Sequence, residues 1–245
     1  METHTRCAAS RAFTLVELLV SVLIIGILIA LTLPSLRSTR NAARDARDAA
    51  LIHDLLMALH AYASDFRDLA PYFGTPAAPD QPLRLDGVTL RNASYFSQAR
   101  LYQHALHPGY IASLDELLYA KPLPTPGDLS LPRTPFTLAQ GPYAAPDYWI
   151  TEETPNDLSL YRPVGLNLVR FPSLKGEILS MRSASMRQTE PADLPLTVLI
   201  GMFDGSASAR VWDAEVDARI IGDRPYGSAP LPVSATREGL FGRDF

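Results

Sequence analysis

The hydrophobic pattern of the chain begins with a long apolar stretch near the N-terminus. Residues 11–36 read RAFTLVELLVSVLIIGILIALTLPSL, and residues 18–36 contain no charged side chain. At about 1.5 Å per helical residue, residues 18–36 span on the order of 28 Å, close to the ~30 Å hydrocarbon core of a bilayer. Because backbone polar groups in lipid must be satisfied within the segment, one membrane-spanning helix is the simplest interpretation.

After Pro34 the pattern changes from uniformly apolar to amphipathic. Proline removes one backbone donor, so Pro34 is expected to bend the helix without ending it. We therefore predict one helix over residues 13–68, with residues 37–69 as its amphipathic continuation and exit. Apolar residues recur there at spacings of three and four, which is the pattern of one apolar helix face: Ile52, Leu55, Leu56, Leu59, Ala63 and Phe66.

Residues 70–245 are predicted to form a globular head. Prolines and glycines predict a loop over residues 70–84, and Asp86-Gly87 predicts a hairpin turn between two short apolar runs. The sequence of residues 94–119 predicts two short helices around a turn at Pro108-Gly109. Prolines crowd residues 122–146, which predicts an irregular surface insert.

The last part of the chain has the composition of β-strands. Asp204-Gly205 separates two apolar runs there, and this dipeptide is the strongest short-range hairpin signal. The expected fold is therefore α+β: a long N-terminal helix, membrane-spanning in its first half, packed on a head with an antiparallel sheet. The predicted strands are residues 148–151, 161–169, 177–181, 197–203 and 207–212.

Length and charge narrow the range of functions. Of the 245 residues, about 175 remain after the long helix, which is enough for one compact core. The net charge of −4 argues against a strongly basic nucleic-acid surface, so no nucleic-acid partner is expected. No glycine-rich phosphate loop, HExxH or GxSxG motif occurs. The sequence therefore predicts no enzyme and no cofactor.

Candidate metal ligands each have a simpler structural interpretation. His53 and His60 lie seven residues apart on the predicted helix, whereas a helical metal site favours a spacing of four. His104 and His107 lie at a predicted helix end, where histidines are mostly structural. Asp204 has no second acid at a useful spacing, and the sole cysteine, Cys7, precedes the apolar stretch. No metal site is predicted.

Glu17 is the one acid inside the apolar stretch. Intramembrane acids are costly and usually have a partner, so Glu17 is a candidate functional residue. A cut between Ala12 and Phe13 would create an α-amino cation in the same apolar layer, and this cation is the expected partner.

Residues 13–18, FTLVEL, resemble the N-terminal motif of type IV pilins and type II secretion pseudopilins. Members of this family have a short basic leader, a small residue, a Phe or Met and TLIEL-like text, often with a helix-bending proline where Pro34 falls. Ala12 departs from the usual Gly. An uncleaved single-pass anchor is the alternative interpretation, and a secretory signal would have a shorter apolar core of about 7–15 residues.

The resemblance implies that residues 1–12 are a leader and residues 13–36 a transmembrane and assembly helix. A prepilin peptidase would cut between Ala12 and Phe13, Phe13 would be N-methylated, and Glu17 would act in assembly. The implied partners are that peptidase, other pilin or pseudopilin subunits, an inner-membrane assembly platform and the bilayer. A basic leader favours the cytoplasmic side, so the head would be exported before the subunit enters a pilus or pseudopilus.

The expected function is a pilin-like structural subunit, either a minor pilin or a type II secretion pseudopilin. The size is large for the bulk subunit of a fibre. One alternative is an exported binding domain on a membrane stalk that never polymerises, and another is an exported enzyme with the same anchor. Glu17 favours the structural subunit over the stalked binding domain, because an anchor that does not assemble has no need of an acid in its membrane span.

Overall fold

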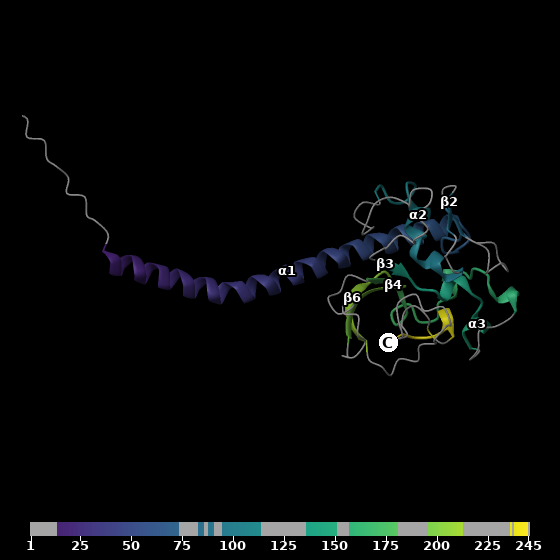
Figure 1. The fold of residues 1–245 in the computed structure, drawn as a ribbon. Helices are drawn as coiled ribbons and strands as arrows, with labels where there is room; N and C mark the ends of the chain where they lie inside the picture. The colour runs from purple at the N-terminus through teal and green to yellow at the C-terminus, as the bar shows by residue number, and fades with distance from the viewer. Residues whose placement is uncertain are drawn as a thin grey trace, which may run out of the picture. The chain divides into compact units, whose positions relative to one another are not determined.

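The structure is a computed structural model that describes residues 14–73, 83–85, 88–90, 95–113, 136–150, 157–180, 196–212, 236 and 238–244. The chain divides into two compact units, residues 1–44 and residues 45–245. Figure 1 shows the elements of each unit. Among the described residues, the first unit contains the start of α1, and the second contains the rest of α1, the sheets and the shorter helices.

Helix α1 (Leu15–Asp65) is the longest element and covers most of the predicted helix. Its first part, Leu15–Leu33, has a mean hydropathy of 2.8 over 19 residues, with none of that window buried. In the described part of the chain it is the one helix long and apolar enough to cross a membrane. Pro34 lies within the helix, and the bend expected there stays a prediction.

Residues 45–65 of α1 form one side of the core of the head. Ile52, Leu55, Leu56 and Leu59 are almost completely buried, which confirms the predicted apolar face. Phe66 was expected on this face but is 49% exposed. The Phe66 N–H still donates to the carbonyl of Tyr62 at 3.0 Å, one helical turn back, and its ring stacks on the half-buried Tyr62 instead of entering the core.

The end of α1 is set by two residues in the left-handed backbone region, Arg67 (φ 59°) and Asp68 (φ 61°). The Asp68 N–H donates back to the carbonyl of Ala63 at 2.7 Å, as in a Schellman-type helix end. A left-handed backbone cannot continue a right-handed helix, which explains why α1 stops three residues before the predicted end.

The described part of the head contains a four-stranded antiparallel sheet in the order β3-β4-β5-β6. Its strands are β3 (Phe136–Leu138), β4 (Gly176–Ser180), β5 (Leu196–Met202) and β6 (Ala207–Trp212). A separate hairpin joins β1 (Leu83–Leu85) to β2 (Val88–Leu90), with Leu85 opposite Val88. The predicted α+β class and both predicted hairpins are confirmed.

The turn between β5 and β6 is built by Asp204 and Gly205. Gly205 has a φ of 84°, a conformation that glycine adopts without steric cost. The Asp204 carboxylate accepts hydrogen bonds from the backbone N–H of Ser206 (2.9 Å) and from its hydroxyl (2.6 Å). Asp204 therefore stabilises the turn through its own side chain, which is the structural role that the sequence favoured.

Helix α1 approaches strand β5 closely at Gly201. A Cβ atom at this position would collide with Cγ2 of Ile52 and would lie 2.9 Å from Cδ1 of Leu56. Only glycine leaves enough space for the helix to lie directly against the strand. This contact confirms that the second half of α1 packs on the antiparallel sheet.

Two of the predicted strands are wrong. Residues 146–150 form helix α3 (Pro146–Ile150), because proline is preorganised for a first helical turn and Asp147 follows it there. Residues 161–169 contain the 3₁₀ turn η4 (Leu166–Leu168) after η3 (Leu158–Leu160). The Leu166 N–H donates to the carbonyl of Asp68 at 2.7 Å, so this segment serves the end of α1 instead of a sheet.

The predicted surface insert, residues 122–146, is wrong for its described part. Phe136 and Leu138 of β3 are buried in the sheet, and Tyr143 in the 3₁₀ turn η2 (Gly141–Tyr143) is fully buried. The apolar run between the prolines pairs with β4 and thereby enters the core.

The helices predicted over residues 94–119 are confirmed for their first part. The segment forms the 3₁₀ helix η1 (Tyr95–Arg100) followed by α2 (Tyr102–Leu106). The second helix, predicted from Ser113, lies outside the described residues.

We predict that Gly201→Ala destabilises the head by about 1–3 kcal/mol, because the added methyl group overpacks the contact with Ile52 and Leu56. Denaturant unfolding of the full-length protein in detergent would measure the change in the free energy of unfolding. Gly109→Ala is the matched control, since no atom lies within 4 Å of the Cβ that it would add. Equal stabilities of the two variants would contradict the close packing described here.

Candidate functional site

The first turn of α1 is closed by a reciprocal pair of side chains, Thr14 and Glu17. The Glu17 carboxylate oxygen Oε2 accepts the backbone N–H of Thr14 at 2.9 Å and the Thr14 hydroxyl at 2.7 Å. In return the Glu17 N–H donates to the Thr14 hydroxyl oxygen at 3.3 Å. This is the geometry of a capping box, in which a Thr and a Glu three residues later satisfy the free N–H groups of a helix start.

The polar side chains further along the apolar half of the helix bond to their own helix. The Ser21 hydroxyl donates to the carbonyl of Glu17 at 2.7 Å, and the Thr32 hydroxyl donates to the carbonyl of Ile29 at 3.2 Å. Internal bonds of this kind are what a helix needs in lipid, where no water is present to satisfy a polar group.

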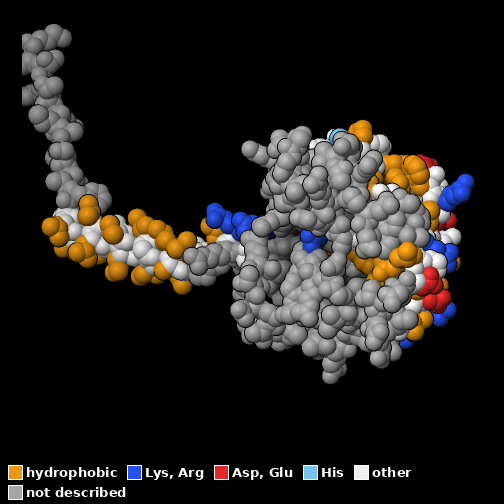
Figure 2. Space-filling view, turned by 45° about the vertical axis from the view of Figure 1, so that its right-hand side comes forward, with side chains coloured by type: hydrophobic (Ala, Val, Ile, Leu, Met, Phe, Trp, Pro, Cys, Tyr) orange, Lys and Arg blue, Asp and Glu red, His pale blue; other side chains and the backbone are white. Residues whose placement is uncertain are grey.

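The apolar side chains of this helix are exposed on all sides. Leu15 is 80% exposed, Leu31 is 71% exposed, and Leu33, near the end of the span, is still 50% exposed. Figure 2 shows hydrophobic side chains along the visible face of this part of the helix. An apolar surface of this extent requires a cover, which a bilayer or the helices of other subunits would supply.

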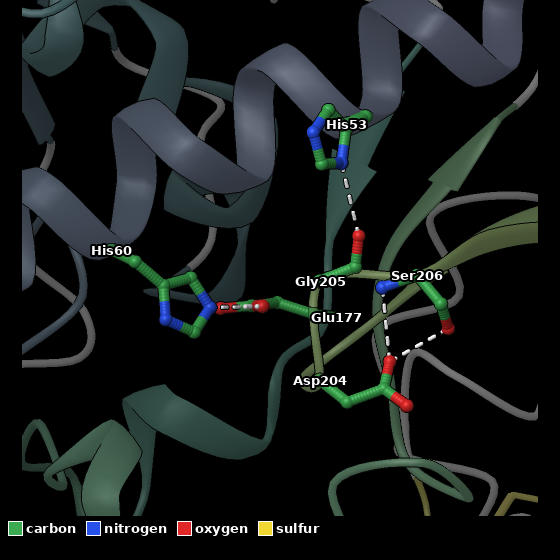
Figure 3. A network of polar contacts seen from close by, with 6 residues as sticks. All are labelled: His53, His60, Glu177, Asp204, Gly205 and Ser206. Atoms are coloured by element: carbon green, nitrogen blue, oxygen red, sulfur yellow. Dashed lines mark hydrogen bonds and ion pairs between the residues drawn. The ribbon is translucent and has the colours of Figure 1, made fainter.

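Within the head, His60 of α1 is bonded to a buried carboxylate of strand β4. His60 Nε2 lies 2.8 Å from Oε2 of Glu177, whose side chain is fully buried, while the His60 side chain is 42% exposed. The other carboxylate oxygen of Glu177 has no hydrogen-bond partner among the described residues. Figure 3 shows that His53, on the same helix, reaches the turn after β5, where its Nδ1 lies 3.1 Å from the carbonyl oxygen of Gly205.

Folding raises the pKa values of both partners, but for different reasons. The hydrogen bond to Glu177 raises the pKa of His60 above 6.5, although partial burial opposes this shift. Burial raises the pKa of Glu177 above 4.5, although the bond to His60 opposes this shift. The folded head therefore holds protons at this pair more tightly than the unfolded chain does.

A second buried pair attaches the C-terminal segment to strand β4. Lys175 Nζ lies 3.2 Å from Oδ1 of Asp244, both side chains are buried, and the Thr236 hydroxyl contacts both groups. The other oxygen of Asp244 accepts the N–H of Gly176 at 2.8 Å. Burial lowers the pKa of Lys175 and raises the pKa of Asp244, and in each case the partner opposes the shift.

The candidate metal ligands that the structure describes form no cluster of three. In the residues that the structure describes, no group of three or more His, Cys, Asp or Glu side chains is placed to hold a metal ion. His53 and His60 have the separate partners given above, and Asp204 is used by its turn.

Comparison with known proteins adds one finding, and it falls on the start of the chain. Residues 7–33 match the family model described as the prokaryotic N-terminal methylation motif. The chain carries this methylation motif. No curated protein and no solved structure matches the chain.

The methylation motif is the signal motif of type IV pilins and pseudopilins, so the resemblance seen in the sequence is confirmed. It supports a precursor of a type IV pilin-like protein or pseudopilin, processed by a prepilin peptidase and assembled with other pilins. Proteins of this family are structural, not enzymatic. Together with the apolar N-terminal helix, which is the one candidate span among the described residues, the motif fits a single-pass membrane-anchored protein.

The predicted site residues lie at or beside the motif. Ala12 and Phe13 fall within the matched residues but outside the described ones. Glu17 lies in the first turn of α1, and Pro34 follows the last matched residue directly. Sequence reasoning missed the partner that the structure gives to Glu17, although Thr-x-x-Glu before an apolar run is a readable capping-box signal.

The buried charges of the head were also missed. Glu177 lies within strand β4, and Lys175 precedes that strand directly. A charged residue inside an apolar strand is the signal that would have indicated a buried, paired group.

We predict that the head loses stability as the pH rises through and above 6.5, the unperturbed value for histidine. Both pKa values of the pair are raised on folding. The contribution of His60 is therefore complete below 6.5, that of Glu177 below 4.5, and each is lost as the pH rises through its folded-state value. Thermal unfolding of the full-length protein in detergent, followed by near-ultraviolet circular dichroism between pH 4.5 and 8.5, would measure the effect.

His60→Gln should flatten this profile, since glutamine can still donate a hydrogen bond but does not titrate. His53→Gln is the control on the same helix, because His53 contacts a carbonyl instead of a carboxylate. A profile that His60→Gln leaves unchanged would rule out the pair as its origin.

Proposed function

We propose that this chain is a minor pilin or a type II secretion pseudopilin that assembles through α1. The observation that carries the proposal is the methylation motif on the apolar part of α1, Leu15–Leu33, none of which is buried, with Glu17 in its first turn. A helix of this kind can leave the bilayer only if other apolar surfaces replace the lipid. Packing against the same helix of other subunits supplies such surfaces.

Processing precedes assembly in this proposal. A membrane prepilin peptidase cuts between Ala12 and Phe13, where a small side chain fits an extended substrate, and Phe13 is then N-methylated and stays cationic. The leader remains cytoplasmic and the head is exported. An inner-membrane assembly platform then moves the subunit from the bilayer into a pilus or pseudopilus.

Glu17 has the chemistry required to set the position of one subunit against the next. Both donors of Thr14 reach Oε2 of Glu17, so within the described first turn Oε1 is left to accept from another group. The N-terminal amine of a neighbouring subunit is a matching cation. Because an unpaired charge in an apolar fibre core costs several kcal/mol, only the axial stagger that joins amine and carboxylate is favourable.

The size of the chain favours a minor component. At 245 residues, the subunit carries a large head for dense packing in the bulk of a fibre. The apolar helix is compatible with either kind of assembly, so the choice between minor pilin and pseudopilin depends on the secretion or pilus system that incorporates it.

One observation favours a second candidate, a membrane-stalked exported domain that does not polymerise. The capping box gives Glu17 a role within its own helix, and that role needs no neighbouring subunit. In this second case Glu17 contributes only the stability of a helix start, typically about 1 kcal/mol.

Processing is predicted to remove residues 1–12 and to add one methyl group to Phe13. Intact-mass analysis of the membrane form would show both changes at once. Ala12→Gly should be processed like the wild type, whereas Ala12→Leu should accumulate as the full precursor because the larger side chain does not fit. A mature wild-type protein that still contains Arg11 would refute this cleavage site.

Assembly is predicted to depend on the charge of Glu17. Glu17→Val should insert and be processed normally but be lost from the fibre or pseudopilus, because breaking a buried pair costs on the order of 3–5 kcal/mol. Glu17→Gln is the decisive partner variant, since glutamine can complete a capping box but carries no charge. The measurement is the amount of each variant that co-purifies with the assembled structure.

If charge pairing sets the register, both variants are lost from the assembly. Incorporation of Glu17→Gln at the wild-type level would show that the cap, not the charge, is the role of Glu17. Incorporation of Glu17→Val at that level would support the stalk and remove Glu17 from assembly altogether.

A further inference from the structure

Lys175 and Asp244 form a buried pair whose two functional groups are in direct contact. Lys175 Nζ lies 3.2 Å from Oδ1 of Asp244, and the two side chains are 1% and 0% exposed. Lys175 directly precedes β4, whereas Asp244 belongs to the C-terminal segment. The pair therefore joins two segments that are 69 positions apart in the chain, at a site from which solvent is excluded.

Burial favours the uncharged forms of both groups. It lowers the pKa of the Lys175 ammonium and raises the pKa of the Asp244 carboxyl, although each partner opposes the shift. Transfer of one proton from Lys175 to Asp244 converts the ion pair into an amine and a carboxylic acid. Because this transfer removes two buried charges, desolvation favours it. A desolvated, uncharged lysine is a nucleophile, and a carboxylic acid is the form of the carboxyl group that it can attack.

The neighbours of the pair have the positions that a condensation requires. The Thr236 hydroxyl accepts from Nζ of Lys175 and donates to Oδ1 of Asp244, so it connects the nitrogen to one carboxyl oxygen. The other oxygen, Oδ2, accepts the backbone N–H of Gly176 at 2.8 Å. A backbone donor at this position stabilises negative charge that develops on Oδ2 during an attack on the carboxyl carbon, as in an oxyanion hole.

The identity of the basic residue supports a chemical role. Of the 22 Lys and Arg residues, only Lys121 and Lys175 are lysines. Arginine is the better partner in a buried ion pair, since its planar fork binds a carboxylate with two hydrogen bonds. A covalent bond to a carboxyl group, by contrast, requires an amine. A lysine at this position of an arginine-rich chain therefore fits bond formation better than it fits an ion pair.

We propose that Lys175 and Asp244 condense to form an intramolecular isopeptide bond. The Nζ lone pair attacks Cγ of the protonated Asp244 carboxyl, and Oδ2 takes up the negative charge beside the N–H of Gly176. A proton passes from Nζ through the Thr236 hydroxyl to Oδ1. The Cγ–Oδ1 bond then breaks, and Oδ1 leaves as water. The products are one amide, with Oδ2 as its carbonyl oxygen, and one water molecule, so no oxidant, reductant or other reactant is needed.

The isopeptide bond ties the C-terminal segment to the start of β4. The contact between the reactants and the exclusion of solvent favour the amide, because the bond forms within one molecule at a buried site. A crosslink of this kind stabilises the head as a disulfide does, by restricting the unfolded chain. The sole cysteine, Cys7, precedes the apolar stretch, so the head has no cysteine with which to form a disulfide.

The test is intact-mass analysis of the denatured full-length protein, followed by tandem mass spectrometry of its tryptic peptides. We expect the wild type to be lighter than its sequence and processing state require, by the mass of one water molecule. Trypsin should not cleave after Lys175, and one branched peptide should join Lys175 to Asp244.

Three variants accompany this measurement. Lys175→Arg keeps the positive charge but has no amine, so it should show its full mass and give no branched peptide. Lys121→Arg is the matched control at the other lysine and should lose water as the wild type does. Thr236→Val removes the proton relay and should slow bond formation by about a hundredfold. Freshly expressed Thr236→Val would then contain an unlinked fraction that falls with time, and a wild-type rate would overturn the relay.

A wild-type protein at its full mass would overturn the proposal. A loss of water that persists in Lys175→Arg would overturn it as well, because the water would then come from another reaction, such as ring closure at Asp86-Gly87 or Asp204-Gly205. The branched peptide needs only the wild type, so the test holds even if a variant does not fold. None of these results depends on leader cleavage or assembly, so a failure here is separate from a failure of the proposed function.

Discussion

The head depends on the close approach of α1 to strand β5 at Gly201. This contact brings Ile52 and Leu56 directly onto the sheet. The neighbouring turns of the helix place His53 beside the β5–β6 turn and His60 beside Glu177 of β4. If the helix stood further from the sheet, the histidines would lose these partners. The absence of a side chain at Gly201 therefore permits both the close packing of α1 on the sheet and the pairing of its two histidines.

Buried charge is the second organising feature of the head. Glu177 and Asp244 are buried carboxylates, each with a basic partner that comes from a distant part of the chain. Replacing such pairs by apolar residues is often neutral or stabilising, so they are weak sources of stability. Their effect is on specificity: any packing that separates the partners leaves a charge buried alone, and such packings are disfavoured.

The sequence predicted elements well where one local signal dominated. The apolar span, the face of α1 through Ile52 and Leu59 and the Asp204-Gly205 hairpin each depend on residues that are neighbours in the chain, and the structure contains all three. The errors arose where long-range contacts overrode local composition. Tyr148 and Trp149 have strand propensity but lie in a helix, and the proline-rich text around Phe136 hides a buried strand.

The candidate site shows the same division. The methylation motif was readable because it is contiguous in sequence, whereas the roles that the resemblance implies for Ala12 and Phe13 stay predictions. The pairing of His60 with Glu177 joins residues that are 117 positions apart, so periodicity gives no sign of it. The Thr14–Glu17 cap is readable from Thr-x-x-Glu, but an acid in an apolar stretch also predicts a partner outside its own helix.

The attachment of the C-terminal segment to the start of β4 has a consequence for the order of folding. Lys175 is synthesised long before Thr236 and Asp244, the groups that surround its ammonium in the folded head. Leu240, in the turn η6 (Gly239–Phe241), is buried as well, and Gly239 lies against the ring of Trp149. A nascent head that ends after β6 thus has an open core and a lysine without its counter-charge. The strands can pair before the C-terminal segment is synthesised. The core is complete only after Thr236, Leu240 and Asp244 have packed against it.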